Sequence, residues 1–300
     1  MCRLWAWEAF AHGAETVCYF RWRQAPFAQE QMHAGLLQPD SADAPALSEA
    51  AQVAQEIAEL PEVGTAKAQV GLVFDYPSAW GWDVQPQGTG FDYFRLVFEV
   101  YRGLRKLGLD IDFVPSGTGD LTQYSLILAP GLMALPASLE DALSRFKGVA
   151  LCGPRCNTKT TELTIPDPLP PNLPGLDMTI NRSETFRADM DRPLEGGGHV
   201  RHWLDHVATN ATVTERTKTG APVLVGDDAV RYLAGWPDED ALNRILTALC
   251  QELQIKTTPM TASLRLRRTA THVFAFNYDL EPAIYEGTTI PPAGVHWSLM

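Results

Sequence analysis

The sequence has few cysteines, no long apolar run and no excess of positive charge. Its five cysteines are odd in number and widely scattered, so a reducing cytoplasm fits them better than a disulfide framework; they are Cys2, Cys18, Cys152, Cys156 and Cys250. No stretch approaches the roughly 18 consecutive apolar residues of a spanning helix. The first residues lead straight into an amphipathic helix, so we expect neither a signal peptide nor a membrane partner.

The charge balance of the chain is acidic. It has 24 Lys and Arg against 36 Asp and Glu, which makes a formal net charge of -12. Nucleic acids and anionic membranes are bound by clustered Lys and Arg, so the sequence argues against both as partners. A hydrophobic content of 45% over 300 residues is ordinary for a globular chain of two domains, or of one domain with appendages.

The most informative stretch covers residues 16–33. Alternating β-branched and aromatic residues predict a strand over 17–22, and Pro26 ends it because proline cannot donate to a ladder. In the loop that follows, Glu30 and His33 are three positions apart and can project from one short helical turn. In a (β/α) barrel the active site lies in the loops that follow the C-terminal ends of the strands. The aromatics, arginines, carboxylate and imidazole of this stretch lie at the end of such a predicted strand and in the loop after it.

Helices flank this stretch on both sides. We expect one over 3–14, with Ala-His-Gly-Ala as its C-cap, and another over 46–60. Together these elements make about one and a half strand–helix units. A closed barrel needs eight strands and roughly 250 residues, so residues 1–60 cannot form one alone. The aromatic helix face of Trp5, Trp7 and Phe10 therefore needs cover from the following domain or from another copy of the chain.

After a short boundary at 61–67, residues 68–253 carry a repeated strand–helix pattern. Apolar runs predict strands over 69–74, 126–129 and 149–152. Periodic apolar residues predict helices over 91–107, 138–146 and 238–253. A half-buried strand over 109–113 and a hairpin of 222–225 with 230–234 complete the pattern. Strands that alternate with helices predict a mostly parallel sheet covered on both faces.

The apolar spacing also predicts which side chains face inward. The helix over 91–107 has an apolar face on which residues recur at spacings of three and four; they are Phe94, Val97, Phe98, Tyr101, Leu104 and Leu107. In the half-buried strand that follows, Leu109, Ile111 and Phe113 alternate with Asp110 and Asp112. From residue 257 to 300 the pattern changes to short alternating strands. These predict a small antiparallel β unit that leans on the preceding domain because its own core is small.

Several long motifs resemble one known family. Residues 3–33 contain Trp-Glu-Ala-Phe-Ala-His-Gly-Ala and Phe-Arg-Trp-Arg-Gln-Ala-Pro-Phe-Ala-Gln-Glu-Gln-Met-His. They closely resemble the end of the catalytic barrel of family 42 glycoside hydrolases, the β-galactosidases. Residues 85–98, Leu128-Ala-Pro-Gly, Tyr232-Leu-Ala-Gly-Trp-Pro and Phe274-Ala-Phe-Asn-Tyr extend the resemblance along the chain.

The resemblance implies three regions. Residues 1–60 would be a remnant of the (β/α)8 catalytic barrel. Residues 68–253 would be an α/β trimerisation domain whose mostly parallel sheet is amidotransferase-like (flavodoxin-like). Residues 257–300 would be a small C-terminal β domain. The resemblance also implies a homotrimer.

The resemblance further implies site residues. Retaining glycosidases use two carboxylates, and in this family both glutamates lie on barrel strands four and seven, to which no residue here corresponds. No catalytic residue is therefore expected in this chain. Glu30 and His33 match family residues that hydrogen-bond galactose hydroxyls, and Phe20 matches an aromatic that lines the sugar pocket.

Two further groups could in principle hold a metal. His199, His202 and His206 have helical metal-ligand spacing, but histidines in a polar amphipathic segment are more often a solvated face. Cys152 and Cys156 are four positions apart without a second ligand pair, so buried or free thiols are the better interpretation. We expect no metal and no cofactor.

Two functions are consistent with these observations. The first is a cytoplasmic β-galactosidase that hydrolyses terminal β-D-galactosides in a complete context, of which this chain carries the sugar-contact wall and the trimerisation region. The second is a non-catalytic oligomerisation module or truncated gene product. Both interpretations predict that the isolated chain is inactive.

Overall fold

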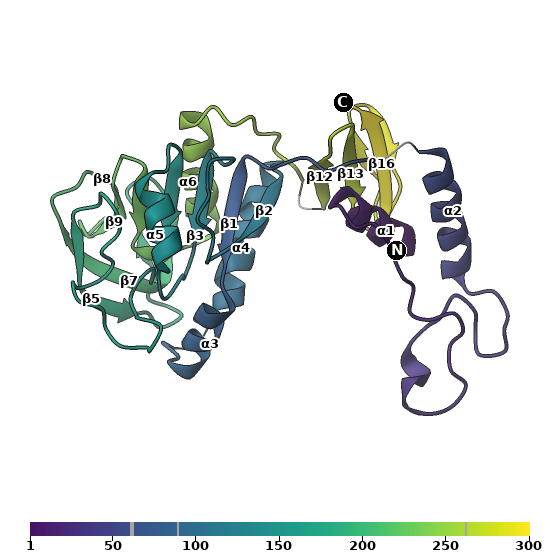
Figure 1. Ribbon diagram of the computed structural model, residues 1–300, viewed down its shortest axis with the longest axis horizontal. Coiled ribbons are helices and arrows are strands. Elements are labelled where there is room, and N and C mark those ends of the chain that lie inside the picture. Colours follow the sequence, from purple (N-terminus) through teal and green to yellow (C-terminus); the bar gives the residue numbers. More distant parts are fainter. Residues whose placement is uncertain (61–62, 89, 262) are drawn as a thin grey trace. The chain divides into compact units, whose positions relative to one another are not determined.

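The computed structural model describes residues 1–60, 63–88, 90–261 and 263–300. These residues divide into two compact units, one of Lys67–Thr258 and one that joins Met1–Ala66 to Pro259–Met300 (Figure 1). The C-terminal segment therefore groups with the N-terminal segment, whereas we expected it to lean on the α/β region before it. Part of the predicted boundary, 61–62, lies outside the described residues. No helix in the described ranges is long and apolar enough to cross a membrane.

The larger unit is built on a mostly parallel sheet. Among the described residues its seven strands lie in the order β2-β1-β3-β4-β10-β9-β8. The parallel strands are β1 (Val70–Phe74), β2 (Ile111–Pro115), β3 (Leu126–Ala129), β4 (Val149–Cys152) and β10 (Val230–Leu233). At the far edge lie two antiparallel strands, β9 (Pro222–Val225) and β8 (Val213–Arg216). The predicted strands over 69–74, 126–129 and 149–152 and the predicted hairpin are confirmed.

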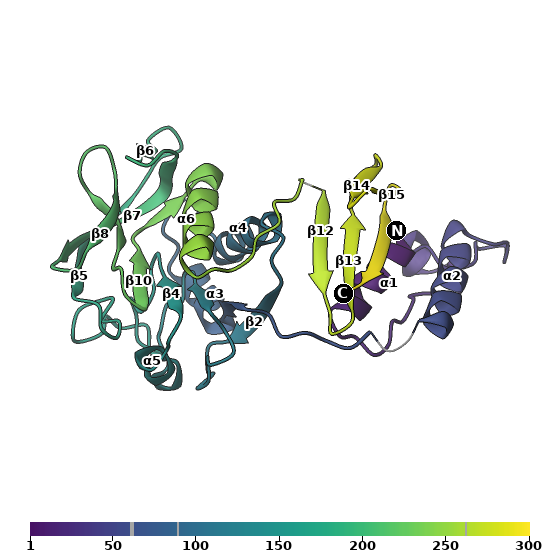
Figure 2. The same cartoon turned by 90° about the horizontal axis from the view of Figure 1, so that it is seen from above.

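Helices cover both faces of this sheet, which is why its central strands are apolar throughout. Helices α4 (Tyr93–Lys106) and α6 (Glu239–Glu252) lie on one face and α5 (Ala137–Ser144) lies on the other (Figure 2). Each of α4 and α6 begins at an aspartate that accepts a backbone N–H: Asp92 from Arg95 at 2.6 Å and Asp238 from Ala241 at 2.9 Å. A further helix, α3 (Tyr76–Val84), was not predicted.

The predicted apolar faces of α4 and β2 are buried only in part. Phe94 and Phe98 are about half exposed, and Phe113 is exposed on β2. Val97 and Leu104 of the same predicted face are buried, as is Val100, which was not part of it. Apolar spacing locates an apolar face, but it cannot say whether this domain or something else covers that face.

A second sheet of the larger unit contains the three histidines. It joins β11 (Gly235–Pro237), β7 (His199–Thr209) and β5 (Met178–Thr185), with β6 (Arg192–Pro193) beside β7. The segment with helical histidine spacing is therefore a strand. Val200, Trp203 and Val207 favour a strand, and pairing with β5 and β11 stabilises it. His202 has φ +62°, which interrupts the simple alternation of the strand.

The smaller unit packs helix α1 (Cys2–Ala11) against a three-stranded sheet. That sheet, within the described ranges, consists of β12 (Leu264–Arg268), β13 (His272–Asn277) and β16 (Gly294–Leu299). The ring of Trp7 lies 5.7 Å from that of Phe274 and 4.6 Å from that of Trp297. The helix face that we expected to need the α/β domain or another copy is thus covered by the C-terminal sheet. Trp5 is the exception and is 59% exposed.

The remaining elements of the smaller unit are short or peripheral. They are the 3-10 helix η1 (Gln29–Met32), helix α2 (Pro45–Glu59) and a hairpin of β14 (Ala283–Tyr285) with β15 (Thr288–Ile290). The strand predicted over 17–22 is not formed, because no neighbouring strand among the described residues offers it a ladder. Its end instead pairs with the segment that follows the loop, where the Leu36 N–H donates to the Arg21 carbonyl at 2.9 Å and the Leu37 N–H to the Trp22 carbonyl at 2.8 Å.

Candidate functional site

The loop between α1 and α2 brings together the three site residues predicted from the sequence. The Phe20 and His33 rings meet edge to face, with centroids 5.7 Å apart. The Arg21 guanidinium lies 5.6 Å from the centre of the Phe20 ring and donates to Glu30 Oε2 at 3.0 Å. Glu30 lies on η1 and His33 is the residue that ends it. The short helical turn predicted for this pair is therefore present.

All three side chains face solvent. Phe20 is 68% exposed, and Glu30 and His33 are exposed as well. An ion pair as exposed as Arg21–Glu30 contributes little net stability, so Glu30 can exchange its partner for a ligand at low cost. A carboxylate, an imidazole and an open aromatic face are complementary to the hydroxyls and the apolar C–H side of a sugar ring.

Arg21 is a residue of this cluster that sequence reasoning did not single out. Arg21 and Glu30 are nine positions apart in the sequence, which matches neither helical nor strand spacing. Only the folded loop brings these two side chains together. A weak signal was available, because Arg21 directly follows the aromatic residue of the cluster. A depression of about 290 Å³ lies beside the cluster and is lined by Phe20 and Arg21 from the loop and by Trp5 from α1, but not by Glu30 or His33.

Gly35 allows the two arms of the loop to approach each other. A Cβ atom at this position would lie 2.5 Å from the Gln24 backbone nitrogen and 3.0 Å from the Arg21 carbonyl oxygen. Real Cβ atoms essentially never approach another atom to 2.5 Å, and the backbone atoms of Gln24 cannot move aside as a flexible side chain could. The Gln24 side chain adds a second link, donating to the Gln31 carbonyl at 2.7 Å.

We therefore expect Gly35→Ala to separate the two arms of the loop. Limited proteolysis should cut within 16–44 at least several-fold faster than in the wild type, while the melting of the larger unit stays unchanged. Gly119→Ala is the matched control, because nothing lies within 4 Å of a Cβ built there. Equal cleavage rates for Gly35→Ala and the wild type would show that the close approach is not needed.

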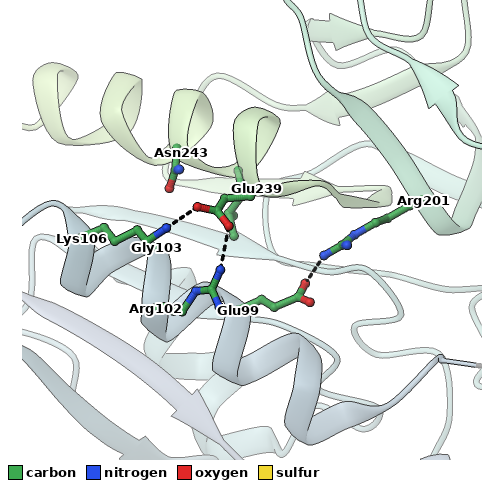
Figure 3. Close-up of a pocket in the computed structure, with 8 residues that line it drawn as sticks. Glu99, Arg102, Gly103, Lys106, Arg201, Glu239 and Asn243 are labelled. Atoms are coloured by element: carbon green, nitrogen blue, oxygen red, sulfur yellow. Dashed lines mark hydrogen bonds and ion pairs between the residues drawn. The ribbon is translucent and has the colours of Figure 1, made fainter. Parts of the chain in front are cut away.

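A second pocket lies on the larger unit between α4, α6 and β7. It encloses about 140 Å³, and its charged side chains pair across it (Figure 3). The Arg102 guanidinium donates to Glu239 at 2.7 Å, Lys106 contacts the same carboxylate, and Arg201 donates to Glu99 at 2.6 Å. These ion pairs join the two helices and the strand. The charged side chains of the pocket therefore have a structural role in holding α4, α6 and β7 together.

The histidines of β7 do not converge on a common point. His206 Nε2 lies 2.8 Å from Glu184, His199 Nδ1 lies 3.1 Å from Asp238, and the His202 ring packs edge-on against Trp236. In the part of the chain that the structure describes, no three His, Cys, Asp or Glu side chains form a group that could hold a metal ion. Cys152 and Cys156 are buried free thiols, as predicted, and a hydrogen bond with Cys152, together with burial, raises the pKa of Cys156.

Comparison with known proteins gives consistent matches over nearly the whole chain. A family model described as "Beta-galactosidase trimerisation domain" matches residues 68–256, and one described as "Beta-galactosidase" matches residues 1–60. A β-galactosidase of Thermus thermophilus is 44% identical over 292 residues, which are 94% of this chain and 44% of that protein.

Solved structures give the same result. The β-galactosidase of the psychrophilic Marinomonas ef1 has a TM-score of 0.92 at 35% identity, and the match covers 98% of this chain and 48% of that one. The β-galactosidase of the Antarctic haloarchaeon Halorubrum lacusprofundi has a TM-score of 0.90 at 27% identity, with 99% and 49% covered.

The fold and these matches define the class as the glycoside hydrolases. Within that class, the chain belongs to the family 42 β-galactosidases, because the trimerisation-domain model alone matches more than half of its residues. The resemblance seen in the motifs is confirmed, as is a mixed α/β fold with a mostly parallel sheet and small antiparallel sheets. The chain spans about 44% of the length of the Thermus relative.

Proposed function

We propose that this chain provides one wall of the sugar-binding site and the oligomerisation region of a retaining β-galactosidase. The observation that carries the proposal is the convergence of Phe20, Glu30 and His33 on one exposed loop. The names of the matched relatives supply the substrate class, β-galactosides. Both catalytic glutamates would come from barrel strands four and seven of the family fold, to which no part of this chain corresponds.

Each side chain of the cluster has a distinct proposed role. Glu30 accepts hydrogen bonds from galactose hydroxyls, and His33 donates or accepts a further one. Phe20 packs on the apolar face of the sugar ring. Arg21 orients the Glu30 carboxylate until the substrate arrives. The cluster positions the sugar and performs no bond-breaking step itself.

The proposal extends to the architecture and the compartment. Residues 1–60 would complete a (β/α)8 barrel, residues 68–253 would be an amidotransferase-like (flavodoxin-like) trimerisation domain, and residues 257–300 would be the C-terminal β domain. Support for the second region comes from the strand order β2-β1-β3-β4 of its parallel strands. The five free thiols fit a cytoplasmic, reducing compartment.

A hybrid enzyme tests the proposed role of the loop. The chain would replace the matching 44% of the Thermus thermophilus β-galactosidase, and turnover of a chromogenic β-galactoside would be measured. We expect the hybrid to be active and Glu30→Gln to lower its kcat/KM by about 10–100-fold, which corresponds to the loss of one or two charge-assisted hydrogen bonds. The isolated chain should show no turnover above a blank.

Glu59→Gln is the matched control, because Glu59 is exposed and lies at the end of α2, outside the loop. Its kcat/KM should stay within a factor of two of the parent hybrid. Unchanged kcat/KM in Glu30→Gln would refute the proposed sugar contact. Clear turnover by the isolated chain would instead require a different pair of catalytic carboxylates.

A further inference from the structure

An exposed aromatic surface covers one side of the larger unit. Its side chains are 50–63% exposed and come from α3, α4 and β2; they are Tyr76, Trp80, Phe94, Phe98 and Phe113. All of them lie within the range 68–256 that matches the trimerisation-domain model. We call these five residues the aromatic surface.

Ring contacts show that the aromatic surface is continuous. Half-buried Phe74, at the end of β1, lies 5.0 Å from Tyr76, 5.6 Å from Phe94 and 6.3 Å from Phe113, measured between ring centroids. Trp80 extends it from Tyr76 at 6.2 Å, and Phe98 follows Phe94 by one turn of α4. The aromatic surface is thus one patch, unlike the single apolar residues that are scattered over most protein surfaces.

The domain itself does not need these outward side chains. Helix α4 already buries Val97, Val100 and Leu104 against the rest of its unit, and α6 packs beside it. Asp75 and Asp92 cap the N-termini of α3 and α4, so both helices are held in place without help from the aromatic surface. A contiguous exposed apolar patch of this kind is typical of a binding surface.

The size and the charge of the chain indicate what covers this surface. Five aromatic side chains, each slightly more than half exposed, present on the order of 500 Å² of apolar area. That is near the upper end for a monomer, and it would form the centre of an interface that buries about 800 Å² per partner. The five side chains carry no charge, so they can form the centre of a contact between two copies of net charge -12 without placing like charges opposite each other there.

We propose that the aromatic surface is the face through which one copy of this chain binds the next in a homotrimer. The proposal rests on the homo-oligomer of the proposed function and assigns its contact to named residues. A closed three-fold ring uses two different surfaces of each copy, so the aromatic surface of one copy meets another part of its neighbour. Mutation of the aromatic surface alone therefore breaks every contact in the ring.

The test is the mass of the 300-residue chain in multi-angle light scattering at micromolar concentration. The wild type should have three times the protomer mass of 33.0 kDa, and Phe94→Glu/Phe98→Glu should have the protomer mass. Leu280→Glu/Ile284→Glu is the control, because both residues are strongly exposed on the smaller unit and the added charge is the same. The control should keep the wild-type mass.

A footprinting measurement covers the case in which the double variant fails to fold. Oxidation of Trp80 by hydroxyl radicals should be at least five-fold slower in the concentrated wild-type protein than after dilution to the protomer. A double variant that keeps the trimer mass, a wild type that is monomeric, or Trp80 oxidation that is independent of concentration would each overturn the proposal. None of these results bears on the proposed sugar contact of Glu30, because that contact is tested separately by the turnover of the hybrid and its Glu30→Gln variant.

Discussion

Trp7→Ala is expected to destabilise the smaller unit by about 3–5 kcal/mol, the usual cost of deleting a large buried aromatic side chain. Trp7 is 1% exposed and packs against Phe10, Phe274 and Trp297. Its indole N–H donates to Glu56 Oε2 at 2.7 Å, so the substitution also removes a hydrogen bond to a charged group. The loss should appear as faster hydrogen exchange throughout 1–60 and 263–300.

Trp5→Ala is the matched control for this prediction. It removes the same side chain from the same helix, but from a position that is 59% exposed, so its effect should be below about 1 kcal/mol. Similar losses for the two variants would contradict the packing of α1 on the C-terminal sheet. Exchange in the larger unit should be the same in both variants, since its core cluster contains no residue of α1.

The stability of the smaller unit should also depend on pH through Glu56. Burial would raise the pKa of this carboxyl, but hydrogen bonds from Arg3, Trp7 and Gln52 outweigh it and hold the pKa below its usual value of 4.5. Because the folded pKa is lowered, the stabilisation is present above the unfolded pKa and is lost as the pH falls through the folded one. The advantage of the wild type over Glu56→Gln should therefore shrink below about pH 4.5.

Asp205→Ala is expected to cost the larger unit about 3–5 kcal/mol, because it leaves several buried donors without an acceptor. Asp205 is 0% exposed. It accepts from Ser183 Oγ at 2.6 Å, Trp203 Nε1 at 2.8 Å and the Tyr232 hydroxyl at 2.8 Å. The network joins β5, β7 and β10, so urea unfolding of the larger unit should shift to a clearly lower midpoint.

Two further variants distinguish the loss of the buried hydrogen-bond acceptor from the loss of a negative charge. Burial raises the pKa of Asp205 although its hydrogen bonds lower it, so the uncharged Asp205→Asn should cost less than Asp205→Ala. Asp189→Ala removes a carboxylate from an exposed loop and should change stability by no more than about 0.5 kcal/mol. If Asp205→Ala were as mild as Asp189→Ala, the buried acceptor would have no structural role.

Local patterns predicted most elements of the larger unit. The strands β3 and β4 have the residues predicted from short apolar runs, since a strand buried on both faces needs apolar residues at every position. The apolar periods placed α4 and α6 to within two residues. The same apolar period placed Phe94 and Phe98 on one face with Val97 and Leu104, yet only the latter two are buried, because periodicity identifies an apolar face and not what covers it.

The smaller unit was less predictable, because its contacts join distant parts of the chain. The residue types over 17–22 are those of a strand, but a strand forms only where a neighbouring chain completes its hydrogen bonds. The histidine segment shows the same limitation in the larger unit. Its spacing fits a helix, whereas pairing with β5 and β11 makes it a strand.

The sequence by itself determined the family, the strands β1, β3 and β4 with the helices α4 and α6, and the candidate residues Phe20, Glu30 and His33, since motifs and apolar periods are local properties. Only the tertiary structure decided that Arg21 pairs with Glu30, that α1 packs on the C-terminal sheet and that the aromatic residues of α3, α4 and β2 form one exposed surface. Each of these depends on which distant segments approach each other, and the free energy of such contacts is determined by packing in three dimensions.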